Sequence, residues 1–173
     1  MEHVIAAPID DSRVAAERVE GLILEHQTKL ARYLRRMVGD AEVAVDLAQD
    51  AFLAAYRMLR ADPERPLTPG WLYKTATNLA ISYLRRQKLI RWSPIDSERH
   101  GIDLRSDERS AASVDLQTAL GKLAPEQAAC VMLTTYAGYT SFEAADILGI
   151  SADAVRQRVC RAMRTLRVVM ANV

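Results

Sequence analysis

TSFEAADILGISADAVRQRVCRAMRTLR, residues 140–167, decides the fold because its local chemistry specifies two helices and the turn between them. Thr140 and Glu143 form a T-x-x-E capping box, in which a hydroxyl and a carboxylate satisfy the free amides at a helix start. Gly149 supplies the left-handed residue that ends this helix, and Ser151 is a good N-cap for the next one. The stretch therefore predicts a helix-turn-helix.

The second of these helices carries an apolar stripe on one side and cations on its other faces. Its apolar residues recur at spacings of three and four, at Val155, Val159, Ala162, Leu166 and Val169. This stripe must face a core. The other faces carry Arg156, Gln157, Arg158, Arg161, Arg164 and Arg167. Because no acid follows Asp153, the cationic surface suits phosphates and base edges of nucleic acid. A solvated charged face is the plain alternative.

Composition favours a helical protein without a cofactor. The 173 residues are 50% hydrophobic and 6% aromatic, and Ala and Leu are abundant. The formal net charge is only +1, but like charges are grouped along the chain and create local fields. Cys130 and Cys160 lack metal-ligand or disulfide spacing, so no zinc site is expected. The absence of a signal pattern and of a long apolar run predicts a cytoplasmic protein without membrane insertion.

Apolar periodicity predicts two helical domains joined by a flexible linker. The first, residues 14–92, should hold three helices, with a proline-rich loop at 61–69 before the third. The linker, residues 93–113, is polar, and its roughly 21 residues reach at most about 70 Å. That reach matches about two turns of duplex DNA. The second domain, residues 114–171, should be a four-helix unit that contains the helix-turn-helix. The predicted fold is therefore all-α.

The second helix of the first domain presents a row of carboxylates. Asp46, Gln49 and Asp50 lie at i, i+3 and i+4, so they share one face, which Glu42 extends by a turn. The row is either a solvated face or a docking surface for a basic partner helix. General acid–base catalysis is disfavoured because an exposed face supplies no desolvation to separate the pKa values.

The third helix of the first domain carries a second candidate nucleic-acid surface. Lys74, Asn78, Ser82 and Arg85 share one face, and further cations follow at Arg86, Lys88 and Arg91. An Asn can recognise a base edge, and the cations can hold phosphates.

Two regions of the chain resemble the group 4, extracytoplasmic-function (ECF) bacterial sigma factors. VDLAQDAFLAAYRML (45–59) and PGWLYKTATNLAISYLRR (69–86) resemble region 2 of that family, and LQTALGKLAPEQAACVMLTTYAGYTSFEAADILGISADAVRQRVCRAMRTL (116–166) resembles region 4. Together the two regions cover about residues 20–91 and 114–166, in the family's order and spacing. The pair is far more specific than region 4 alone, because many regulators share a similar helix-turn-helix.

The resemblance implies a role for each surface. Asp46, Gln49 and Asp50 would dock on the clamp helices of the largest subunit of core RNA polymerase. The 61–69 loop and Asn78 would hold an unpaired base of the promoter's minus-ten element. The backbone of that element would contact Arg85, Arg86 and Lys88. The minus-thirty-five element would contact Arg156, Gln157, Arg158 and Arg161. An anti-sigma factor is an expected further partner.

The chain departs from the family pattern at four places. Ser82 stands where the family often has Asp or Asn, and Gln127 replaces a common basic residue. The segments 141–145 and 153–155 also differ, the latter at the start of the recognition helix. The family's promoter sequences therefore do not carry over to this chain.

The residues and the resemblance together predict a transcription initiation factor that binds core RNA polymerase, confers promoter recognition and assists promoter melting. No enzymatic activity is expected. The alternative is a stand-alone helix-turn-helix regulator that binds duplex DNA as a dimer, which would not need the Asp46, Gln49 and Asp50 face. A hydrolase or nucleotide-binding enzyme is disfavoured because the sequence has no Gly-rich phosphate loop and no nucleophile elbow.

Overall fold

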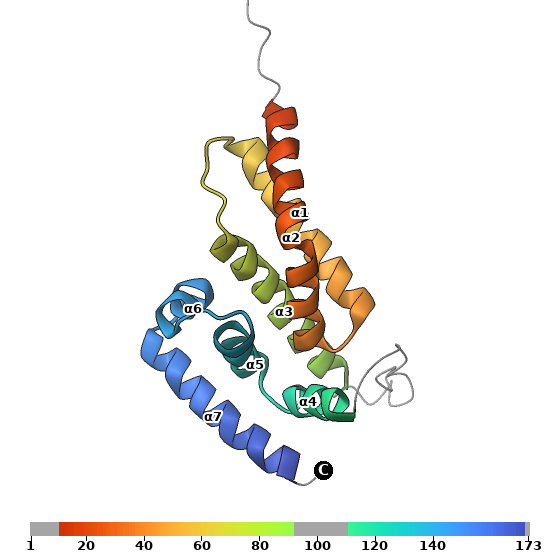
Figure 1. The fold of residues 1–173 in the computed structure, drawn as a ribbon, viewed down its shortest axis with the longest axis vertical. Helices are drawn as coiled ribbons and strands as arrows, with labels where there is room; N and C mark the ends of the chain where they lie inside the picture. Colours follow the sequence, from red (N-terminus) through yellow and green to blue (C-terminus); the bar gives the residue numbers. More distant parts are fainter. Residues whose placement is uncertain (1–10, 92–110, 172–173) are drawn as a thin grey trace, which may run out of the picture.

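The computed structural model describes residues 11–91 and 111–171, and within these residues every element is a helix, as predicted. The first group comprises α1 (Asp11–Val38), α2 (Ala41–Ala61) and α3 (Pro69–Arg91). The second group comprises α4 (Ala111–Gly121), α5 (Pro125–Val131), the π-helical segment η1 (Met132–Tyr136), α6 (Ser141–Leu148) and α7 (Ala152–Ala171). The predicted all-α class with two groups of helices is confirmed (Figure 1).

Most of the expected linker lies outside the described residues, as does the N-terminal segment before Asp11. The helix α4 begins at Ala111, so the last three residues assigned to the linker already belong to a helix.

Side-chain caps begin two helices of the first group. The Asp40 carboxylate accepts from the amides of Glu42 at 2.8 Å and Val43 at 3.1 Å and so begins α2. The Thr68 hydroxyl accepts from the Trp71 amide at 3.2 Å and begins α3. These side chains satisfy amides that have no partner within the helix, which fixes where each helix starts.

The predicted helix-turn-helix is also confirmed. The Thr140 amide donates to the Glu143 carboxylate at 2.8 Å, and the Glu143 amide donates back to the Thr140 hydroxyl at 3.3 Å. Gly149 ends α6 with a φ of +66°, and the Ser151 hydroxyl accepts from the Ala154 amide at 3.1 Å to begin α7. The two helices therefore meet at a turn that their own side chains define.

The segment after Pro125 differs from its expected form. The sequence pattern predicts one helix as far as Tyr136, but the last turn is a π-helix in which the Ala137 amide donates to the Met132 carbonyl at 2.9 Å. Within this turn the Thr134 hydroxyl donates to the Cys130 carbonyl at 2.8 Å, and this bond competes with the regular backbone ladder.

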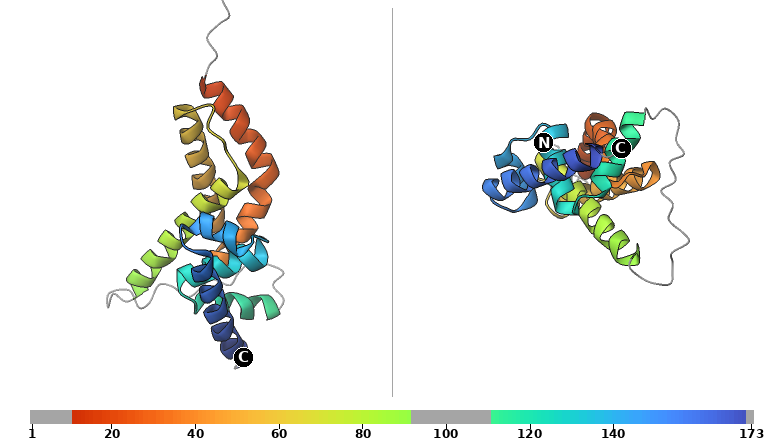
Figure 2. Two further views of the ribbon diagram at one scale, coloured as in Figure 1. Left: turned by 90° about the vertical axis from the view of Figure 1, so that its left-hand side faces the viewer. Right: turned by 90° about the horizontal axis from the view of Figure 1, so that it is seen from below.

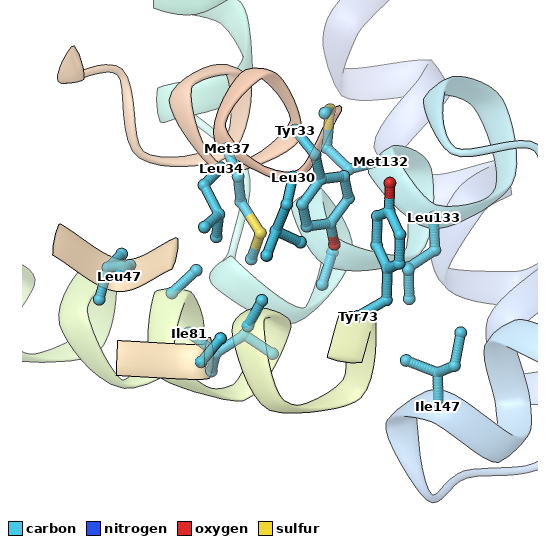
Figure 3. Packing of buried hydrophobic residues seen from close by; sticks show 14 of the residues in the cluster. Leu30, Tyr33, Leu34, Met37, Leu47, Tyr73, Ile81, Met132, Leu133 and Ile147 are labelled. Atoms are coloured by element: carbon cyan, nitrogen blue, oxygen red, sulfur yellow. The ribbon is translucent and has the colours of Figure 1, made fainter. Parts of the chain in front are cut away.

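The two groups of helices share one core, and the second group lies against one end of the first (Figures 1 and 2). Figure 3 shows Leu30 and Tyr33 of α1 beside Tyr73 of α3 and Leu133 of η1. The rings of Tyr33 and Tyr73 meet edge to face at 5.2 Å, and Tyr73 meets Tyr139 in the same way at 5.4 Å. This aromatic chain joins α1 and α3 to the segment that precedes α6.

Candidate nucleic-acid interface

The carboxylate row on α2 is exposed, whereas Leu47 on the same helix is buried. Asp46 and Asp50 form no ion pair within the described residues, so their charges face solvent. Gln49 lines a groove of about 690 Å³ between α1 and α2. The groove is mainly apolar and includes two exposed large residues, Val45 and Leu53, which are 46% and 43% exposed. The structure therefore places apolar surface beside the acidic row, a feature that the charge pattern does not indicate.

The residues predicted for the minus-ten element fall into two classes. Asn78 and Arg86 are exposed, and neither forms a side-chain hydrogen bond or ion pair within the described residues. Arg85 and Lys88 instead contact the second group of helices. The Arg85 Nε donates to the Glu126 carboxylate at 2.8 Å, and the Lys88 ammonium donates to the Leu123 carbonyl at 2.9 Å.

Trp71 lies half-buried at the start of α3 and packs against the core, so its ring is not free for base stacking as a whole.

Glu126 forms an ion pair with Arg85, and the charge of Arg158 also acts on its carboxyl. Burial raises the pKa of its carboxyl, but the backbone at Glu126, the hydrogen bond and charge of Arg85, and the charge of Arg158 together hold that pKa below its usual range. Glu126 lies in the first turn of α5, where a helix start favours an acid for reasons of its own. The sequence pattern indicated no role for Glu126, because the helix start alone accounts for an acid at this position.

Arg158 lies apart from the other predicted contacts of α7. Arg156, Gln157 and Arg161 are exposed, whereas Arg158 is half-buried and hydrogen-bonds the thiol of the buried Cys130. Burial raises the pKa of that thiol, although the charge and hydrogen bond of Arg158 oppose the shift. The structure therefore divides the predicted minus-thirty-five set into three exposed side chains and one half-buried side chain that faces α5.

Arg156 is oriented by two neighbours that sequence reasoning did not connect with it. Its guanidinium pairs with the Asp153 carboxylate and lies over the Phe142 ring, 5.7 Å from the centroid. Phe142 is 71% exposed, an uncommon environment for a Phe side chain. Both neighbours lie in the segments that depart from the family pattern, and that departure is the signal that could have identified them.

Among the described residues no group of three or more His, Cys, Asp or Glu side chains could hold a metal ion. None of the described helices combines the length and the apolar character of a membrane span.

Comparisons with known proteins agree on one family. The model of Sigma-70 region 2 matches residues 22–90, and that of Sigma-70 region 4 matches residues 113–166. The ECF RNA polymerase sigma factor SigL of Mycobacterium tuberculosis is 31% identical over 161 residues, and the match covers 90% of each chain.

Two further matches are consistent with these. SigE of Mycolicibacterium smegmatis, also an ECF sigma factor, is 31% identical over 157 residues, which are 87% of this chain and 61% of that protein. The solved structure of CnrH in complex with the cytosolic domain of CnrY matches with a TM-score of 0.63 at 27% identity. That match covers 94% of this chain and 97% of the other.

The two region models match the two helical groups in order, and the SigL match extends along nearly the whole of both chains. The chain belongs to the ECF RNA polymerase sigma factors, the transcription initiation factors that bind core RNA polymerase and direct it to promoter DNA.

Proposed function

We propose that the acidic row of Asp46, Gln49 and Asp50 is the surface that docks on core RNA polymerase. The observation that carries this assignment is a row of exposed carboxylates without an ion-pair partner in the described residues, bordered by the apolar groove between α1 and α2. Complementary charge orients a partner and speeds association, while apolar contact slows dissociation. An amphipathic basic helix of the polymerase fits both properties.

Residues 14–92 form the unit that binds the minus-ten element in this proposal. Asn78 and Arg86 are free to contact DNA, the first through a base edge and the second through phosphate. Arg85 and Lys88 join them once their contacts with Glu126 and Leu123 are released. The 61–69 loop lies at the N-terminal end of α3 and would hold the unpaired base, which stabilises the melted strand.

Residues 114–171 form the unit that binds the minus-thirty-five element. The exposed side chains of Arg156, Gln157 and Arg161 lie on one helix that follows a capped turn, which is the geometry that places a helix in the major groove. Arg158 would contribute after it leaves the Cys130 thiol. The catalytic chemistry of transcription belongs to the polymerase, and we assign none to this chain.

An anti-sigma factor is the regulatory partner in this proposal. The related CnrH was solved in complex with the cytosolic domain of CnrY. The CnrH match covers 94% of this chain. A partner that covers the acidic row of α2 would exclude the polymerase.

Charge reversal on the acidic row tests the proposal. The variant Asp46→Lys/Asp50→Lys should bind core polymerase about tenfold or more weakly and should lose promoter-directed transcription, because two attractive charges become repulsive. Asp146→Lys is the matched control, since Asp146 is an exposed acid on α6, away from the row. Unchanged core affinity of the double variant, with an unchanged circular dichroism spectrum, would refute the docking role.

A further inference from the structure

The Arg156 side chain is held by two neighbours, although it lies on an exposed face of α7. The Asp153 carboxylate, one turn earlier on the same helix, accepts a hydrogen bond from the guanidinium and forms an ion pair with it. The guanidinium carbon lies over the ring of Phe142, 5.7 Å from the centroid, and Phe142 belongs to α6. Because the two neighbours come from different helices, they orient Arg156 relative to the whole helix-turn-helix.

Both neighbours of Arg156 lie at helix starts that are fixed by their caps. Phe142 is in the first turn of α6, beside Glu143, whose capping box with Thr140 sets where that helix begins. Asp153 is in the first turn of α7, which begins at the Ser151 cap. The amides of a helix start also stabilise a carboxylate at this position. The two contacts to Arg156 therefore come from capped helix ends.

Core packing does not account for the Phe142 ring. The side chain is 71% exposed and belongs neither to the buried core nor to the partly buried residues that pack against the core. The contact that the structure does give this ring is with the Arg156 guanidinium. A cation over an aromatic face is attracted by the quadrupole of the ring. The ring is therefore placed to orient a cation on the surface of the helix-turn-helix.

Arg156 belongs to the face of α7 that lies opposite the buried stripe. This face consists of exposed residues at helical spacing, namely Asp153, Arg156, Gln157, Cys160 and Arg164. A recognition helix contacts base edges with the residues near its N-terminal end. Among the arginines of this face Arg156 is nearer to that end than Arg164. Arg156 is therefore the arginine of this face that would meet a base edge.

An oriented guanidinium beside a carboxylate is suited to guanine. Guanine presents two acceptors, O6 and N7, in the major groove, and the N–H donors of Arg156 that Asp153 leaves unused can bind both. Holding the guanidinium in one orientation before binding reduces the loss of side-chain freedom when the two bonds form. The Asp153 carboxylate also repels phosphate, so it disfavours the sequence-independent contact that Arg156 would otherwise make.

We propose that Phe142 and Asp153 are positioning residues that hold the Arg156 guanidinium for bidentate recognition of one guanine in the minus-thirty-five element. The proposal rests on the DNA-binding role proposed for α7. Arg156 makes the base contact, and the two positioning residues act through it. Phe142 and Asp153 lie in segments 141–145 and 153–155, which depart from the family pattern. The arrangement therefore gives this chain a base preference that its relatives need not share.

Selection of promoter fragments tests the role of the ring. The full chain, bound to core polymerase, selects from duplex fragments in which the minus-thirty-five region is randomised, and the bound fragments are sequenced. Wild type should prefer guanine at one position, which Arg156→Gln identifies by removing the preference. Phe142→Leu should reduce discrimination at that position about two- to fivefold and leave the other positions unchanged. Phe142→Tyr keeps the aromatic face and should retain the discrimination. Leu24→Ala, which truncates an exposed apolar side chain of α1, is the control.

The carboxylate has a signature that a merely structural role would not give. Asp153→Asn should reduce discrimination at the same position, because Arg156 loses one of its two supports. The same variant should bind DNA without the element about two- to fivefold more tightly, because the repulsion between carboxylate and phosphate disappears. Its salt dependence on such DNA should steepen by about one phosphate contact. Asp146→Asn removes an exposed acid of α6 and should leave the discrimination and the salt dependence unchanged.

The native thiol of Cys160 separates failure of this inference from failure of the proposed function. Cys160 is exposed on the same face as Arg156, whereas Cys130 is buried, so N-ethylmaleimide applied before assembly with core polymerase should modify Cys160 and block promoter selection. Unchanged selection after this modification and in Arg156→Gln would refute the DNA-binding role of the face, and the inference with it. If both treatments alter selection while Phe142→Leu and Asp153→Asn keep wild-type discrimination, or lose it equally at all positions, the positioning role alone is overturned.

Discussion

The hydrogen bond between Tyr33 and Thr77 gives a quantitative test of the packing between α1 and α3. Both side chains are fully buried, and the two hydroxyl oxygens lie 2.8 Å apart. Burial raises the pKa of the Tyr33 phenol well above its ordinary range, so the group is neutral at all working pH values. Tyr33→Phe removes one hydroxyl and leaves the other without its partner. The loss of a hydrogen bond together with an unsatisfied buried group costs about 1–3 kcal/mol.

The lower half of that range is expected, because the Thr77 hydroxyl can turn toward a carbonyl of the preceding helical turn. Urea unfolding of Tyr33→Phe should therefore show a loss of about 1–2 kcal/mol, with the midpoint lowered and the slope unchanged. Thr77→Val should lose a similar amount. In the double variant neither hydroxyl remains, so the loss should be smaller than the sum of the single losses by at least about 0.5 kcal/mol. Additive losses would show that the two hydroxyls do not interact.

Three further substitutions test local helix chemistry, two at the helix-turn-helix and one in α1. Gly149→Ala should destabilise the chain by about 1 kcal/mol, because a Cβ there meets nothing within 4 Å and the cost is purely that of a φ of +66°. Gly21→Ala lies inside α1 with equally open surroundings and should stabilise the chain by about 0.5–1 kcal/mol. The two glycine substitutions should therefore shift the melting temperature in opposite directions. The backbone and side-chain hydrogen bonds of Thr140 lower the pKa of Glu143. The stabilisation of the folded state by these hydrogen bonds should be fully present above the ordinary pKa of Glu. It should be lost as the pH falls through the lowered pKa of Glu143. Glu143→Gln should abolish this part of the pH dependence of the free energy of unfolding. The same pH dependence in wild type and Glu143→Gln would contradict the prediction.

Local chemistry explains why the helix boundaries were predictable from sequence. A cap is specified by residues within one turn of each other, so Asp40, Thr68 and Ser151 determine their helix starts without help from the tertiary structure. The apolar stripe of α7 is equally local, and Val155, Ala162 and Leu166 are buried as expected. The π-helical turn at Met132–Tyr136 carries no such signal, since its apolar spacing fits a regular helix as well.

The arrangement of the two groups had no comparable signal. Tyr33, Tyr73 and Tyr139 lie on apolar faces of their own segments, and nothing in that pattern indicates that they meet one another. The sequence likewise shows where cations gather but not which of them stay free. Residue roles in polymerase and promoter binding therefore remain predictions, and the structure adds which of those side chains are available without rearrangement.

The pairing of Arg85 with Glu126 shows how a carboxylate of the same chain can occupy a cation of the proposed DNA-binding surface. A surface that holds phosphates must be cationic and accessible, and in the free protein the nearest carboxylate of the same chain competes for it. Glu126 is placed to do so for Arg85, because a helix start already stabilises its negative charge before the arginine approaches. The acidic row on α2 has no such internal competitor among the described residues, which leaves it free for the polymerase in the docking proposed above.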